Sequence, residues 1–184
     1  MKTVKDKQLV VGADRGGFAL KEAVVAHLKE QGWEILDLGV KSIDEENPDM
    51  FHRIGFKVGA KISEGEYEKA LVFCGTGMGI HIAAGKCPRV HAAVVESVPA
   101  ALRCVCGNGC NVMSMGGNYV APRMGIECAE AFLNHNLGDG YEERPTFYPY
   151  HKLAYDEITA FDYEAFKKNN FEVIKLGEPP EMNR

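Results

Sequence analysis

The sequence lacks any run of about 18 apolar residues, which is the length that a membrane-spanning helix needs. It also lacks an excess of positive charge, because 21 Lys and Arg residues stand against 26 Asp and Glu residues. A nucleic-acid-binding protein needs a basic surface to replace the counterions of the phosphates, so the composition argues against that class. The basic residues at the N-terminus are not followed by the apolar segment of a signal peptide. We therefore expect a cytoplasmic protein that has neither a membrane nor a nucleic acid as its partner.

The cysteines lack the Cys-x-x-Cys spacing that is typical of zinc sites. The six cysteines are Cys74, Cys87, Cys104, Cys106, Cys110 and Cys128. Hydrophobic residues make up 46% of the chain, which is enough for a core that needs no disulfides. We therefore expect small buried thiols and no bound metal.

Short apolar runs alternate with segments of helical periodicity along the first 140 residues. The runs predict strands at 8–13, 33–38, 70–74, 90–95 and 111–115, and the periodic segments predict helices at 18–31, 50–63, 80–86, 99–106 and 123–136. Asp49 is expected to cap the second of these helices. Strands that alternate with helices predict an α/β fold, in which a five-stranded parallel sheet carries helices on both faces.

Residues 141–184 differ in composition from the rest of the chain. The stretch 141–151 is aromatic and broken by prolines, and 177–184 is typical of a frayed end. We expect residues 1–140 to form one domain and residues 141–184 to form a C-terminal extension that packs on a partner subunit of a homodimer or tetramer.

Glycine-rich segments mark the expected binding site, because ligands of open parallel sheets bind where strands end and helices begin. Three such segments are expected at that edge, namely 12–17, 74–79 and 107–109. In the second, glycines let the main chain approach a ligand, and the amides that follow offer donors to an anion. Beside these donors, Cys74 can supply a thiolate that removes a proton next to a carbonyl, and the Thr76 hydroxyl can donate to the oxygen on which charge develops.

A structural interpretation of the same segment is that a buried cysteine precedes a tight turn. Two nucleotide sites are excluded by spacing. The dinucleotide pattern G-x-G-x-x-G requires glycine at position 80, where this chain has isoleucine, and the P-loop requires a Gly-Lys-Ser/Thr sequence that does not follow. His81, one step beyond the loop, is interpreted as a satisfied or exposed histidine in preference to a site residue.

Three segments of the sequence resemble the ribose-5-phosphate isomerase B family, which includes the two subunits of galactose-6-phosphate isomerase. They are GADRGGFALKE at 12–22, CGTGMGIHIAAGKCP at 74–88 and NGCNVM at 108–113, and the resemblance covers roughly residues 8–140. It implies a Rossmann-like three-layer α/β/α sandwich and an active site shared between two subunits. It also implies isomerisation of an aldose to a ketose through an enediolate, without metal or cofactor.

The resemblance also assigns roles to individual residues. It implies that Cys74 is the base that moves a proton between C1 and C2 of the sugar. Gly75, Gly77, Met78 and Gly79 match the loop that holds the enediolate oxygens. Asp14 and Asn108 match residues that contact the substrate.

The chain departs from the family pattern where the substrate's phosphate and ring are handled. Arg15 replaces a histidine that helps to hold the phosphate, and its guanidinium can do so by two parallel contacts. Gly107 replaces the histidine that opens the sugar ring, and Asn118 replaces an arginine, with Arg123 nearby. The phosphate-holding arginines of the late helix are matched by Arg144 as one candidate, with His151 and Lys152 as alternatives.

The sequence therefore predicts an aldose–ketose isomerase of a small sugar phosphate, nominally the pair ribose 5-phosphate and ribulose 5-phosphate. Because Gly107 carries no imidazole, an open-chain substrate is an alternative. A tetrose phosphate fits this logic, since its phosphorylated terminal oxygen cannot close a ring, and a ketohexose phosphate or a keto sugar acid is also open. Two further alternatives are one subunit of a hetero-oligomeric isomerase of the galactose-6-phosphate type and a non-catalytic module that binds sugar phosphates.

Overall fold

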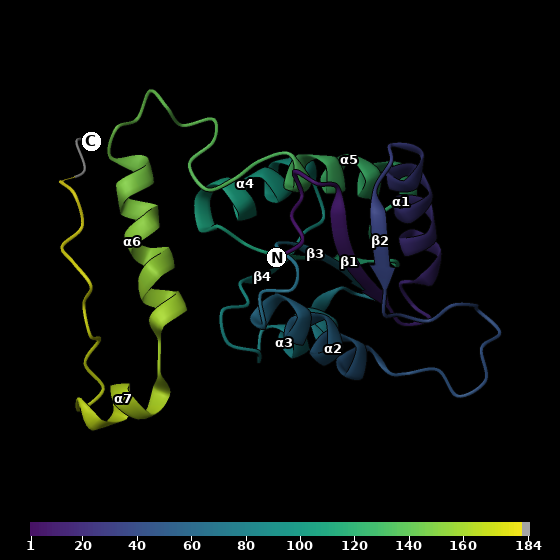
Figure 1. Ribbon diagram of the computed structural model, residues 1–184, viewed down its shortest axis with the longest axis horizontal. Helices are drawn as coiled ribbons and strands as arrows, with labels where there is room; N and C mark the ends of the chain where they lie inside the picture. Colours follow the sequence, from purple (N-terminus) through teal and green to yellow (C-terminus); the bar gives the residue numbers. More distant parts are fainter. Residues whose placement is uncertain (182–184) are drawn as a thin grey trace.

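The computed structural model describes residues 1–181 and contains one parallel sheet of five strands (Figure 1). The strands are β1 (Gln8–Ala13), β2 (Glu34–Asp37), β3 (Ala70–Cys74), β4 (Ala92–Val94) and β5 (Val112–Gly116). Their order across the sheet is β2-β1-β3-β5-β4, so β3 lies at the centre. In this register, Phe73 pairs with Ala13 of β1, and Cys74 pairs with Gly116 of β5. The ends of three neighbouring strands therefore meet at one edge of the sheet.

Five helices connect or follow these strands, as the apolar periodicity predicts. They are α1 (Phe18–Glu30), α2 (Phe51–Ser63), α3 (Met78–Ala84), α4 (Val98–Asn108) and α5 (Pro122–Leu133). The predicted cap at Asp49 is wrong, because α2 has Met50 at its N-cap and no side chain bonded there. The Asp49 carboxylate instead pairs with Lys57 and Arg53 on the exposed surface of the helix.

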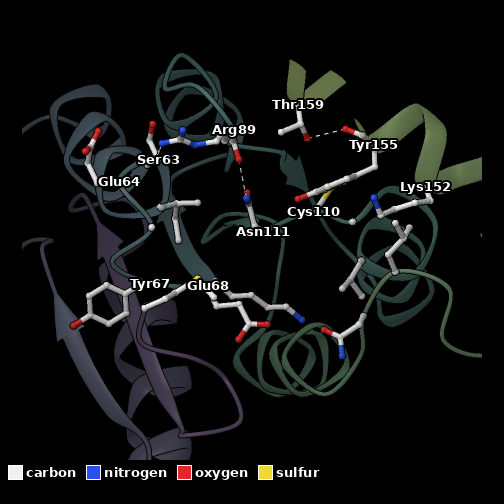
Figure 2. Close-up of a pocket in the computed structure, with 18 of the residues that line it drawn as sticks. Ser63, Glu64, Tyr67, Glu68, Arg89, Cys110, Asn111, Lys152, Tyr155 and Thr159 are labelled. Carbon is white, nitrogen blue, oxygen red and sulfur yellow. Dashed lines mark hydrogen bonds between the residues drawn. The ribbon is translucent and has the colours of Figure 1, made fainter. Parts of the chain in front are cut away.

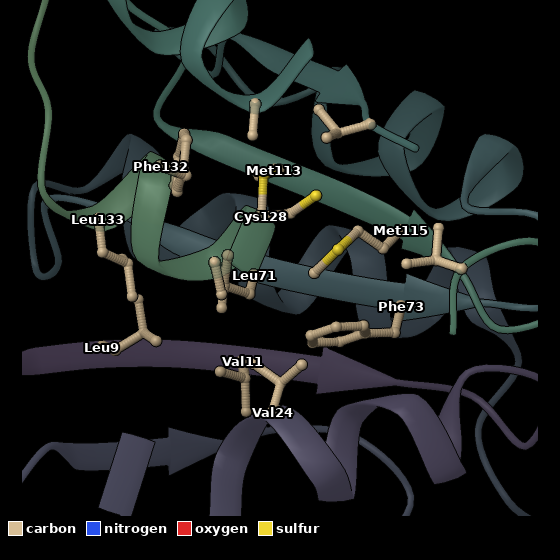
Figure 3. Packing of buried hydrophobic residues seen from close by; sticks show 14 of the residues in the cluster. Leu9, Val11, Val24, Leu71, Phe73, Met113, Met115, Cys128, Phe132 and Leu133 are labelled. Carbon is tan, nitrogen blue, oxygen red and sulfur yellow. The ribbon is translucent and has the colours of Figure 1, made fainter. Parts of the chain in front are cut away.

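The core consists of two apolar layers, one on each face of the sheet. Helices α1, α4 and α5 cover one face, where Leu71 and Phe73 of β3 pack with Phe132 of α5 (Figure 3). Helices α2 and α3 cover the other face, toward which Val72 points. Alternate residues of β3 thus face opposite layers, as the period of two in a strand requires. The expected three-layer α/β/α sandwich is confirmed.

The C-terminal extension contains two helices that the sequence did not predict, α6 (Phe147–Ala160) and α7 (Tyr163–Lys168). In Figure 1, α6 stands beside the β4 end of the sheet, and after α7 the chain turns back and runs alongside α6, on the side away from the sheet. The ring of Tyr155 in α6 packs on Gly109 at the end of α4 and on the His91 ring before β4. Phe161 and Phe171 stay more than half exposed, at 57% and 59%. This extension therefore presents apolar side chains that its own chain does not cover.

All six cysteines are free thiols, and all except Cys87 are buried. Among the described residues, no helix combines the length and the apolar character that crossing a membrane requires.

Candidate active site

The loop that follows β3 is fixed by contacts of its main chain with β5. Gly77 has a φ of 76°, a conformation that favours glycine. A Cβ at this position would lie 2.9 Å from the carbonyl carbon of Met115. The Ser114 hydroxyl, buried in β5, donates to the Gly77 carbonyl oxygen at 2.6 Å. The geometry of the loop is therefore set by the sheet beneath it.

Cys74 ends β3 with its side chain turned into this loop. Only 4% of the residue is exposed, and its Sγ accepts a hydrogen bond from the Gly77 main-chain N–H at 3.0 Å. A donor aimed at sulfur stabilises the negative charge of a thiolate, which is the form of cysteine that can act as a base. The position of Cys74 is further defined by α1, because Gly17 packs so closely that a Cβ there would lie 2.6 Å from the Cys74 nitrogen.

Thr76 and the residues after it supply polar groups at the mouth of the loop. The Met78 N–H donates to Thr76 Oγ1 at 3.3 Å, so this oxygen accepts a bond while its own proton is available to a ligand. Met78 is half exposed. The Nδ1 atom of His81 lies 2.6 Å from the Met78 carbonyl oxygen, which agrees with the structural interpretation of this histidine.

The segment after β1 forms the second side of the site. A Cβ on Gly16 would lie 2.7 Å from the Gly75 nitrogen, so the two loops touch through their main chains. Asp14 accepts a hydrogen bond from the Gly17 N–H at 3.1 Å. Burial raises the pKa of the Asp14 carboxyl, and the N–H groups of Gly17 and Gly16 oppose that rise. Arg15 is exposed and donates to the carbonyl oxygen of Glu45 at 2.5 Å. The structure thus brings Asp14 and Arg15 to the same edge as the loop 74–79.

Asn118 completes the candidate site. The sequence did not predict this role and showed Asn118 only as the residue that replaces an arginine of the family pattern. Its main-chain N–H donates to the Gly75 carbonyl oxygen at 2.9 Å. Its Nδ2 atom lies close enough to Gly75 that a Cβ there would be 3.3 Å away. The signal that could have found it is the Gly116-Gly117 pair directly after a predicted strand, because that strand ends at the same edge.

The expectation that 107–109 lies at this edge is wrong. The segment forms the C-terminal end of α4 and precedes β5, so it belongs to the amino edge of the parallel sheet, opposite Cys74. Gly109 ends α4 with a φ of 61°, and Asn108 is exposed there. A connection from a helix to a strand reaches the amino edge, whereas a connection from a strand to a helix reaches the carboxyl edge.

Arg144 also lies toward the amino edge, in the connection between α5 and α6. Helix α5 ends at this edge. Its residue Phe132 accepts a hydrogen bond at 3.0 Å, through its carbonyl oxygen, from Nζ of Lys69, which lies just before β3. Arg144 is exposed, with its guanidinium carbon 5.9 Å from the ring centroid of Tyr141. Of the alternatives on α6, Lys152 pairs with Asp156. The predicted site residues therefore form two groups at opposite edges of one chain.

A pocket of about 710 Å³ opens at the amino edge between α6 and the body of the protein (Figure 2). Its walls include Arg89 and Asn111, whose side-chain amide donates to the Arg89 carbonyl oxygen at 2.8 Å, and Lys152 and Tyr155 of α6. Of the residues predicted for the site, Lys152 and Gly109 of the segment 107–109 line this pocket, whereas Cys74, Thr76, Asp14, Arg15, Asn108 and Arg144 do not. Within residues 1–181, no group of three or more His, Cys, Asp or Glu side chains is arranged to hold a metal ion.

Comparison with known proteins gives three kinds of similarity. The family described as Ribose/Galactose Isomerase matches residues 9–146. The chain is 40% identical over 162 residues to the 4-deoxy-4-sulfo-D-erythrose isomerase of Clostridium sp. (strain MSTE9), which covers 88% of this chain and 99% of that protein. It is 32% identical over 133 residues to D-erythrulose-4-phosphate isomerase 2 of Mycolicibacterium smegmatis, and this match covers 71% of this chain and 84% of that protein. The solved structure of ribose-5-phosphate isomerase B from Clostridium thermocellum matches with a TM-score of 0.73 at 27% identity, and the match covers 88% of this chain and 99% of that one.

Proposed function

The chain belongs to the ribose/galactose isomerase family and is an aldose–ketose isomerase, and we propose that its substrate is an open-chain four-carbon sugar with a sulfonate or phosphate on C4. Gly107 carries this proposal, because the position of the family's ring-opening histidine has no side chain. A four-carbon aldose can close a ring only through the oxygen on C4. A sulfonate bonded to C4 replaces that oxygen and a phosphate ester blocks it, so neither substrate has a ring to open.

The names of two relatives support a four-carbon substrate. One relative is a 4-deoxy-4-sulfo-D-erythrose isomerase and another is a D-erythrulose-4-phosphate isomerase. Ribose 5-phosphate, the nominal substrate expected from the sequence, is the second candidate, and the similarity to a solved ribose-5-phosphate isomerase B favours it. Ribose 5-phosphate forms a ring through its C4 oxygen, so its turnover requires a ring-opening acid in place of the missing histidine.

The proposed chemistry is proton transfer by Cys74. The thiolate, stabilised by the Gly77 N–H, removes the proton from C2 of the aldose and delivers it to C1 of the enediolate. A proton passes from the oxygen on C2 to the oxygen on C1 in the same interconversion. The Thr76 hydroxyl and the main-chain N–H groups of the loop 75–79 hold these two oxygens while charge develops on them.

We propose further that each site is shared between two copies of this chain. A five-residue strand spans about 16 Å, so Asn108 and Arg144 at the amino edge cannot contact a four-carbon substrate held by Cys74 of the same chain. A two-fold axis can place the amino edge of one subunit against the carboxyl edge of the other. The exposed apolar side chains of the extension 141–184 support the proposal that this segment packs on the partner.

Solvent-deuterium incorporation tests the chemistry and the substrate together. The purified protein and its Cys74→Ala variant are each incubated in deuterated water with 4-deoxy-4-sulfo-D-erythrose, D-erythrose 4-phosphate, ribose 5-phosphate and a ketohexose phosphate, and exchange is followed by proton NMR. We expect exchange beside the carbonyl and ketose formation with a four-carbon substrate, both lost in Cys74→Ala. Faster turnover of ribose 5-phosphate would contradict the four-carbon proposal. No exchange with any sugar would favour a missing partner chain or a binding module.

Complementation tests the shared site. Cys74→Ala and Asn108→Ala subunits are purified separately, dissociated together and reassembled. If the site is shared, a mixed dimer has one site that contains both substitutions and one site that keeps both Cys74 and Asn108. We therefore expect the mixture to show activity well above that of either variant alone. Activity that stays at the level of the two variants would contradict a shared site.

A further inference from the structure

The space beside Gly107 is filled by an arginine from the preceding turn of α4. A Cβ on Gly107 would lie 2.9 Å from Nε and 3.0 Å from Cζ of Arg103. Residues four apart on a helix are surface neighbours, so this contact is a local consequence of the helix. A histidine at 107 would displace the Arg103 guanidinium, and glycine is what leaves room for it.

Two aromatic rings hold this guanidinium in place. Its Nη1 atom donates to the Tyr141 hydroxyl at 3.1 Å, and its Cζ lies 5.6 Å and 5.2 Å from the ring centroids of Tyr141 and Phe147. The two rings are stacked, with their centroids 3.7 Å apart. Contacts of a guanidinium with aromatic rings orient it and leave its outward N–H groups free for an anion.

The positive charge of Arg103 is not neutralised by an acidic side chain of the described residues. Within residues 1–181, Arg103 and Arg144 form no ion pair, whereas Arg53 and Arg123 are paired with carboxylates. The guanidinium of Arg144 also lies near the Tyr141 ring, at 5.9 Å from its centroid. Tyr141 therefore brings two unpaired guanidinium groups into one neighbourhood.

We propose that Arg103 binds the terminal anion of the substrate in the site of the partner subunit, with Arg144 as a second donor. This inference rests on the proposed function. A group that opens a furanose ring acts on the oxygen of C4, so the place beside position 107 faces C4 of the sugar. In a four-carbon substrate, C4 is the carbon that carries the sulfonate or phosphate. A guanidinium there meets two anionic oxygens with two parallel N–H groups.

The experiment separates binding of the anion from other roles of Arg103. Arg103→Met, Arg103→Lys and the control Lys29→Met, which removes one exposed cation from α1, are assayed with 4-deoxy-4-sulfo-D-erythrose, D-erythrose 4-phosphate and the neutral D-erythrulose. For Arg103→Met we expect kcat/KM to fall at least 100-fold with both anionic substrates, mainly through KM, and to change less than threefold with D-erythrulose. Arg103→Lys should retain part of the activity, and added guanidinium ions should partly restore Arg103→Met. The anion that gives the higher kcat/KM in the unmodified protein identifies the native group.

Inhibition by inorganic sulfate provides a readout that does not need a neutral substrate. We expect its inhibition constant to rise at least tenfold in Arg103→Met and to stay unchanged in Lys29→Met. An equal loss with neutral and anionic substrates, or an unchanged inhibition constant, would overturn the proposal. If the unmodified protein turns over only ribose 5-phosphate, the four-carbon proposal fails, and comparing ribose 5-phosphate with ribose still decides the role of Arg103.

Discussion

The Nε2 atom of His91 lies 3.0 Å from the hydroxyl oxygen of Thr159, and this hydrogen bond ties α6 to the β4 end of the sheet. The same imidazole bonds to the main chain of Asn108 and packs on the ring of Tyr155, with centroids 4.5 Å apart. One buried histidine therefore joins the C-terminal extension to the end of α4, where a proposed substrate contact lies.

Burial of His91 makes the free energy of unfolding depend on pH. Burial lowers the pKa of His91 below its ordinary value of 6.5, although the bond to Asn108 opposes the change. The unfolded chain therefore binds a proton at a higher pH than the folded one. The full contribution of neutral His91 is present above pH 6.5 and is lost as the pH falls from there toward the lowered pKa, by about 1.4 kcal/mol for each unit of lowering. Thermal unfolding between pH 8 and pH 5 measures this loss. His91→Gln should flatten that part of the profile, and His52→Gln should not; equal profiles for His91→Gln and the unmodified protein would contradict the assignment.

Removal of the Cys74 thiol should abolish proton transfer without unfolding the protein. Loss of a general base lowers kcat by roughly 10²–10⁴-fold. We therefore expect Cys74→Ala to lose activity by such a factor while keeping its circular dichroism spectrum. Cys87→Ala is the matched control, since Cys87 is a partly buried thiol that lies beyond α3 and away from the loop 74–79. Similar losses in both variants would count against Cys74 as the base.

Gly77 and Gly65 form a matched pair for testing the fit of the loop. Both have a positive φ, 76° and 68°, but a Cβ on Gly77 would press on Met115 whereas a Cβ on Gly65 meets nothing within 4 Å. Gly65→Ala should lower the free energy of unfolding by about 1 kcal/mol, which is the cost of the backbone conformation. Gly77→Ala should cost at least twice as much and should also lower kcat, because the N–H bonded to Cys74 moves. Denaturant titration and steady-state kinetics measure both effects, and equal unfolding free energies would refute the argument.

Lys21 and Lys41 both approach the Asp37 carboxylate, but only Lys21 is fully buried. Its Nζ donates to Asp37 at 2.8 Å and to the Val40 carbonyl oxygen at 2.9 Å, which anchors the connection from β2 to α2. Lys21→Met leaves a half-buried carboxylate without this partner and should lower the free energy of unfolding by about 3 kcal/mol. Lys41 is 61% exposed in its side chain, so Lys41→Met should cost less than about 1 kcal/mol. Comparable losses in the two variants, measured by urea titration, would contradict this ranking.

The sheet and its five helices could be predicted because their signals are local. Apolar residues recur with the strand or helix period inside each element, and strand order alone places the loop 74–79 and Asp14 at one edge. The predicted beginning of α3 at 80 was two residues late, because the positive φ of Gly77 permits the helix to start at Met78.

What the sequence did not predict depends on contacts between distant segments. Asn118 joins the candidate site through a hydrogen bond to Gly75, which lies in the loop after another strand. Helix α6 carries a proline and several aromatic residues that are unfavourable to a predicted helix, and it is held by contacts with His91 and Gly109 from other parts of the chain. Asp49 precedes a helix as a cap should, but pairing with Lys57 competes for its carboxylate.

The glycines of the candidate site have an evolutionary consequence. Gly16 against Gly75, and Gly116 and Gly117 against the neighbouring loops, build the floor of the site from main chain. A side chain at Gly16, Gly116 or Gly117 would collide with the main chain beside it, and one at Gly75 would lie 3.3 Å from Nδ2 of Asn118. Substitution of these glycines is therefore expected to disrupt the site and not to change which sugar it binds. A change of sugar is therefore expected to come from the side chains around this floor, such as those after β1, at the end of α4 and after α5, while the proton-transfer loop is inherited intact.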